Sequence, residues 1–124
     1  MVNVLAVALG GAIGSTLRYG VNELLGSRLR GEFPLATFLV NVSGAFLLGV
    51  VLTLAVERTS VTHWWRLFLC VGVLGGYTTF STLSYETVEL IAEGAYATAA
   101  VNAAGSLAAG LVAVAAGIWV GRLL

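Results

Sequence analysis

The chain has 124 residues, of which 59% are hydrophobic and only 10% are charged, and its formal net charge is zero. Soluble domains carry roughly 25% charged residues, so this composition excludes an ordinary soluble domain. The single cysteine, Cys70, rules out an internal disulfide and a cysteine metal cluster.

Four apolar segments, each long enough to cross a bilayer, follow one another along the chain. A membrane-spanning helix needs about 20 mostly apolar residues. The segments cover approximately residues 2–25, 35–56, 64–91 and 95–121. Because the connections between them are short, no room remains for a soluble domain. We therefore predict one all-α membrane domain over residues 1–124.

The first and fourth segments carry small residues at the spacing that brings helices together. Gly10 and Gly14 are four residues apart, and so are Gly117 and Gly121. This spacing lets two helix backbones approach closely in lipid. The pattern is compatible with packing inside one chain and with packing between two copies.

Polar residues inside the second and fourth segments are candidates for function, because burying them in hydrocarbon is costly. Thr37 precedes Asn41 by one helical turn, and Asn102, Ser106 and Gly110 share one helix face. An isolated hydroxyl often donates to the carbonyl four residues earlier, whereas its own helix cannot satisfy the Asn41 amide fully. Neutral amide and hydroxyl donors favour a small anion over a cation.

The third segment is predicted to be interrupted at the middle of the bilayer. Gly75 and Gly76 are followed by Tyr77, and then by hydroxyl residues on both sides of Phe80. Two glycines each cost a helix about 1 kcal/mol, and open backbone in a membrane is tolerated only where protein or a cavity satisfies it. The positive edge of the Phe80 ring suits weak contact with an anion. This segment indicates passage of an ion or solute.

The positive charges are almost evenly divided between the two ends of the predicted bundle. Arg58, Arg66 and Arg122 lie at one end, Arg28 and Arg30 lie at the other, and Arg18 is closer to the membrane. Membrane orientation follows such an imbalance. Since the bias is weak, we expect insertion in both orientations and an antiparallel dimer.

Three stretches resemble the helix signatures of one family, the Fluc/CrcB fluoride channels. Residues 10–19 resemble the first-helix signature, residues 34–44 the second and residues 72–86 the third. The resemblance implies an antiparallel, dual-topology homodimer with two fluoride pathways, in a cell membrane (plasma or inner) of prokaryotic type. It also implies a structural Na⁺ at the dimer centre, held by the backbone carbonyls of Gly75 and Thr78.

The resemblance also implies roles for single residues. The family's fluoride pathway maps onto Asn41, Phe80, Ser81 and Thr82, with Thr37 nearby and with Asn102, Ser106 and Gly110 on the fourth helix. Arg18 and Glu86 match charged positions of the family. For these two we expect a structural role, as a pair or cap near the membrane interface.

Two departures from the family pattern concern the pathway. Leu83 stands where the family usually has a second phenylalanine, so one ring-edge contact is missing. Fluoride then passes with a lower rate or selectivity, or the chain pairs with a paralogue that supplies the ring. Gly110 replaces a common serine and removes one hydroxyl.

The function expected from these observations is passive, fluoride-selective export across the membrane, with no enzymatic activity and no nucleic-acid partner. A small dual-topology multidrug or guanidinium exporter is an alternative, but it would need an acidic residue deep in the first helix. Glu23 falls near the end of that helix. A structural, non-conducting subunit is a second alternative, but it does not explain the polar third segment. His63 stands beside Trp64 and Trp65, as in an interfacial aromatic belt.

Overall fold

The computed structural model describes residues 1–26, 31–57 and 62–124. Within these ranges every regular element is a helix. Four helical spans are long and apolar enough to cross a membrane: Val2–Leu25, Leu35–Val56, His63–Ala92 and Tyr96–Leu123. The predicted all-α architecture with four long apolar helices is confirmed. Arg28, Arg30 and Arg58, which enter the predicted charge comparison, lie outside the described residues.

The first two spans are regular α-helices, and the last two are composite. Helix α1 covers Val2–Leu25 and α2 covers Leu35–Glu57. The third span consists of α3 (His63–Arg66), the π-helix η1 (Leu67–Leu74), α4 (Gly75–Tyr77) and α5 (Phe80–Ala92). The fourth consists of α6 (Tyr96–Ala100), the π-helix η2 (Val101–Gly105) and α7 (Ser106–Leu123). Short π-segments inside helices occur frequently at functional sites.

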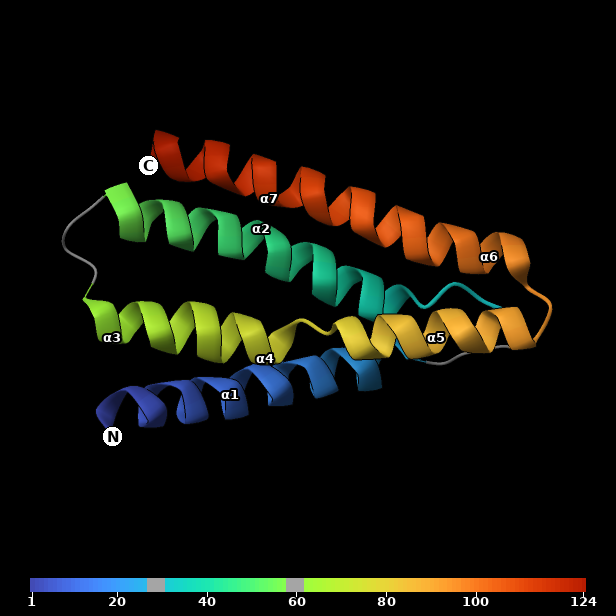
Figure 1. The fold of residues 1–124 in the computed structure, drawn as a ribbon, viewed down its shortest axis with the longest axis horizontal. Coiled ribbons are helices and arrows are strands. Elements are labelled where there is room, and N and C mark those ends of the chain that lie inside the picture. Colours follow the sequence, from blue (N-terminus) through green and yellow to red (C-terminus); the bar gives the residue numbers. More distant parts are fainter. Residues whose placement is uncertain (27–30, 58–61) are drawn as a thin grey trace.

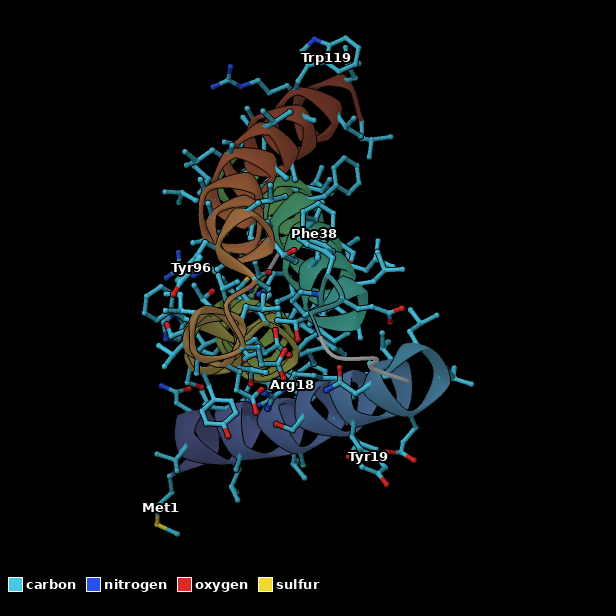
Figure 2. All side chains as sticks on the ribbon, turned by 90° about the vertical axis from the view of Figure 1, so that its right-hand side faces the viewer. Met1, Arg18, Tyr19, Phe38, Tyr96 and Trp119 are labelled. Atoms are coloured by element: carbon cyan, nitrogen blue, oxygen red, sulfur yellow. The ribbon has the colours of Figure 1, made fainter. Side chains whose placement is uncertain are left out.

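The spans are arranged side by side in an order that differs from the chain order. In Figure 1 the third span lies between α1 and α2, and the fourth span lies beyond α2. Helix α1 packs mainly on η1 and α4, and α2 packs mainly on α7. The two termini lie at the same end of the molecule (Figure 1). Seen along the helices, the cross-section is elongated, with Met1 and Trp119 at its two extremes (Figure 2).

Both predicted pairs of small residues contact helices of the same chain. A Cβ atom at Gly10 would lie 2.9 Å from the Cα of Gly72, and one at Gly14 would overlap the carbonyl of Val73. In the fourth span, Cβ atoms at Gly117 and Gly121 would collide with α2 in the same way. Only glycine permits these approaches, which fix α1 against the third span and α7 against α2.

Few large side chains are buried in the single chain. Val40 and Asn102 are the largest fully buried side chains of the described residues, while long apolar side chains line the outside of every span. An exposed apolar surface of this extent matches contact with lipid or with another protein chain. Phe80 belongs to this outer surface, with 81% of its area exposed.

Candidate functional site

The backbone is extended at two residues between α4 and α5. Thr78 has φ −77° and ψ 156°, and Thr79 has φ −152° and ψ 113°. These values lie in the β region, which β-branched residues such as threonine favour. The Thr79 hydroxyl accepts a hydrogen bond from the Thr82 amide at 3.2 Å and caps the N-terminus of α5. Helix α5 therefore begins as a new helix with its own cap.

The side chain of Asn41 satisfies the backbone of Thr79. Its Oδ1 accepts from the Thr79 amide at 2.7 Å, and its Nδ2 donates to the Thr79 carbonyl at 3.1 Å. A primary amide has two N–H donors, so one donor of Asn41 remains for another partner. Thr79 is thus the partner outside its own helix that we expected the Asn41 amide to need.

For two carbonyls, the amides that an uninterrupted helix would give them have other partners. In an α-helix the Thr79 amide would donate to Gly75, and the Thr82 amide would donate to Thr78. Here the first amide donates to Asn41 and the second to the Thr79 hydroxyl. The carbonyls of Gly75 and Thr78 are therefore available to another partner.

A groove of about 630 Å³ lies between the start of α5, α2 and α7. Its lining brings together five residues of the predicted fluoride pathway, namely Asn41, Phe80, Leu83, Ser106 and Gly110. Most of the remaining lining is apolar. A few neutral polar groups thus face an otherwise hydrophobic groove.

Most hydroxyl groups along this groove have already donated their hydrogen. Thr78 donates to the Leu74 carbonyl, Ser84 to Phe80 and Thr87 to Leu83, each across one helical turn. These hydroxyls therefore donate to the carbonyl four residues earlier, as expected for isolated hydroxyls. Ser106 differs, because the residue is 95% buried and its hydroxyl has no hydrogen-bond partner within the described residues.

Asn102 points its amide group at α5. Its Nδ2 donates to Thr87 Oγ1 at 3.0 Å, and its side chain is fully buried. Since Thr87 gives its own hydrogen to Leu83, it accepts from Asn102. The Asn102 Oδ1 has no hydrogen-bond partner among the described residues, and an acceptor of this kind does not suit an anion.

A smaller cavity of about 330 Å³ lies on the other side of α5. Thr82 and Glu86 line it, together with the end of α1 and the start of α2. The Thr82 hydroxyl accepts from Thr79 at 2.9 Å. Glu86 is 98% buried and accepts a 2.7 Å hydrogen bond from Thr37, which is equally buried. Thr37 thus contacts Glu86 and does not line the larger groove.

Ser81 and Arg18 lie outside the two cavities. Ser81 is exposed, and its hydroxyl is 3.4 Å from that of Thr79. In Figure 2 Arg18 lies on the side of α1 that faces the other helices, whereas Tyr19 points away from them.

Thr79 and Thr87 were not predicted from the sequence as partners of the two asparagines. Both are threonines in an apolar span. Thr79 lies 38 positions from Asn41 and Thr87 lies 15 positions from Asn102, so no local pattern links the partners. No feature of the sequence distinguishes Ser106 from the other hydroxyl residues. These pairings arise only when α5 is packed against α2 and the fourth span.

Comparison with known proteins shows the family to which the chain belongs. A family model described as "CrcB-like protein, Camphor Resistance (CrcB)" matches residues 5–118. The chain belongs to this family. A relative from Solibacter usitatus is 44% identical over 120 residues, covering 97% of this chain and 95% of the relative.

Further relatives carry the same name at similar identity. One from Methylobacterium sp. (strain 4-46) is 48% identical over 93% of this chain and 92% of its own length. One from Thermus thermophilus is 50% identical over 90% of this chain and 88% of its own length. All three relatives are named fluoride-specific ion channel FluC. With four apolar spans and CrcB-family membership, the chain is a membrane protein.

Proposed function

We propose that this CrcB-family chain is a fluoride-selective ion channel that lets fluoride leave the cell passively. One observation carries the proposal beyond the relatives' names. Two residues that line one groove at the start of α5 each have an uncommitted, neutral donor, namely the second N–H of Asn41 and the buried hydroxyl of Ser106. Such donors replace the water of a small, strongly hydrated anion.

The N-terminus of α5 strengthens the preference for an anion. Helix α5 has 13 residues and starts at Phe80. The N-terminus of a helix carries a partial positive charge of about half an elementary charge. A charged lysine or arginine at this point would hold an anion too firmly, whereas dipoles and neutral donors let it leave again.

The direction of transport follows from the electrical potential across the membrane. An anion moving out of a cell with a negative interior gains about 2.3 kcal/mol per 100 mV. Fluoride enters as the neutral acid, loses its proton in a neutral cytoplasm and then needs an anion pathway to leave. The proposed mechanism requires neither an energy-coupling motif nor a proton-accepting carboxylate.

A structural Na⁺ is part of the proposal. The carbonyls of Gly75 and Thr78 are the two groups whose helical amides have other partners. Sodium is a small, hard cation that takes oxygen ligands, so these residues fit it. No cluster of acidic, histidine or cysteine side chains offers a competing metal site in the described ranges. When bound, the ion would satisfy both carbonyls and hold the interruption open near the middle of the bilayer.

The working unit is proposed to be an antiparallel dimer in the cell membrane. Phe80 is exposed in the single chain, although it lines the groove. A second copy would cover such side chains and close the groove into a pathway. Two copies in opposite orientation would give two equivalent pathways and would bring together two sets of free carbonyls.

The direct test is fluoride efflux from liposomes that contain only this chain, measured with a fluoride electrode. We expect rapid efflux once the membrane potential is released by a potassium ionophore, and little chloride efflux under the same conditions. A guanidinium-loaded sample tests the exporter alternative. Guanidinium transport coupled to protons, or liposomes that retain fluoride, would overturn the proposal.

The sodium site is tested by melting temperature as well as by flux. Detergent-solubilised protein is dialysed into sodium-free choline buffer and then titrated with Na⁺ or K⁺. Ligands that bind the folded state raise its stability. We expect Na⁺, and not K⁺, to raise the melting temperature, and equal curves in both salts would remove sodium from the proposal.

A further inference from the structure

Tyr77 is the last residue of α4 and directly precedes the two extended threonines. Its hydroxyl is 3.1 Å from the hydroxyl of Ser43 on α2. Ser43 donates its own hydrogen to the Leu39 carbonyl at 2.6 Å. Because a hydroxyl has a single hydrogen, Tyr77 must be the donor of the hydrogen bond to Ser43. The direction of this bond is therefore fixed.

The tyrosine ring lies directly against the backbone of α2. A Cβ atom at Gly44 would lie 3.2 Å from Tyr77 Cδ1 and would overlap the methyl group of Thr78. Gly44 is buried, and only its missing side chain lets α4 come so close to α2. The Ser43–Tyr77 bond and the Gly44 contact thus hold the same part of the third span.

Helix α2 consequently holds the interruption on both sides of Thr78. Asn41 binds the backbone of Thr79, the residue after Thr78. Ser43 binds Tyr77, the residue before it. Asn41 binds both backbone groups of Thr79, and the Tyr77 side chain adds an attachment to α2 on the α4 side. The Thr78 carbonyl belongs to the same planar peptide group as the Thr79 amide and lies between these two anchors.

We propose that Tyr77 is a positioning residue of this channel, which acts through its hydroxyl bond to Ser43. Together with Asn41 it sets the orientation of the Thr78 peptide groups at the start of α5. The proposal rests on the proposed channel function for its effect on conduction. Its effect on the backbone stands independently of that function.

The first experiment measures exchange of the Thr79 amide proton by NMR in detergent micelles. We compare Tyr77→Phe, which keeps the ring and removes the hydroxyl, with Tyr96→Phe, a matched change at an exposed tyrosine. A typical hydrogen bond contributes about 1 kcal/mol, which corresponds to about fivefold in an equilibrium constant. We expect about fivefold faster exchange in Tyr77→Phe and no change in Tyr96→Phe. Equal exchange in Tyr77→Phe and the unaltered chain would overturn the proposal.

The second experiment asks whether both residues act through one bond. Ser43→Ala should reproduce the effect of Tyr77→Phe on exchange and on fluoride efflux, and the double variant should add nothing further. Ser43→Thr keeps a hydroxyl and should restore both measurements. Effects that add in the double variant, or a Ser43→Thr variant that behaves like Ser43→Ala, would show that the hydroxyl pair is not the cause.

The two measurements separate failure of this inference from failure of the proposed function. If the unaltered chain does not conduct fluoride, the channel proposal is wrong, while the exchange data still test the role of Tyr77. If the unaltered chain conducts and Tyr77→Phe alters neither exchange nor the preference for fluoride over chloride, only the positioning role is wrong.

Discussion

Asn41 and Thr79 form a closed pair in which one side-chain amide donates to, and accepts from, the same backbone residue. The pair explains how an apolar span keeps two residues out of the helical conformation. An unpaired backbone group in a bilayer costs several kcal/mol. Asn41 provides, from the neighbouring α2, what water would provide in a soluble protein.

Asn41→Asp should strongly reduce fluoride passage. The carboxylate can still accept from the Thr79 amide, but it loses both N–H donors and faces the Thr79 carbonyl with an oxygen. A negative charge in the groove also repels an anion. We expect fluoride efflux to fall by about tenfold or more, equivalent to about 1.4 kcal/mol. Asn3→Asp, the same change at an exposed position, is the control. Undiminished efflux in Asn41→Asp would remove this residue from the pathway.

Ser106→Ala should lower conduction without lowering stability. The Ser106 hydroxyl is the buried groove hydroxyl without a partner in the described structure, so it is free to donate to a passing anion. A hydrogen bond to a charged group contributes about 1.5–3 kcal/mol, so we expect a loss of efflux of about tenfold or more. The melting temperature should stay equal or rise, because a buried polar group without a partner is removed.

Ser84→Ala is the matched control for that change. Ser84 also lines the groove, but its hydrogen is donated to the Phe80 carbonyl at 2.9 Å. We expect its fluoride efflux to remain near that of the unaltered chain. If both variants lost efflux equally, an uncommitted donor would not be what distinguishes Ser106.

Leu83→Phe should increase fluoride efflux or its preference over chloride. Leu83 lines the groove and is half-buried, so an aromatic ring there can present its edge to the pathway. Specific aromatic contacts contribute about 0.5–1.5 kcal/mol, which corresponds to about two- to tenfold in rate. Leu111→Phe places the same ring at an exposed groove position as a control. A Leu83→Phe variant identical to the unaltered chain would show that a second ring is not missing here.

Gly14→Ala should destabilise the protein by about 1–3 kcal/mol, because an overpacked contact forces backbone shifts. Its Cβ atom would overlap the Val73 carbonyl and lie 2.8 Å from the Tyr77 amide. Gly20→Ala, in the same helix, has open space around the added methyl group and serves as the control. Thermal unfolding in detergent measures both. Equal melting temperatures would mean that α1 does not approach the third span as closely as described.

The sequence alone determined the class of the protein and the positions of its spans. Long, mostly apolar stretches are typical of helices in lipid, so composition and length led to four apolar helices close to the observed bounds. Predicted pathway residues such as Asn41, Phe80 and Ser106 line one groove. Residue types were sufficient here, because each type has a fixed cost in hydrocarbon.

Tertiary structure decided which partner each polar group takes. Local spacing joined Thr37 to Asn41 on one helix face, yet Thr37 bonds Glu86 and Asn41 bonds Thr79. The glycine pairs were open to packing inside or between chains, and they contact helices of this chain. Spacing along one helix defines a face but not the helix that covers it. Hydrogen bonds across 38 to 49 residues depend on how separate helices pack.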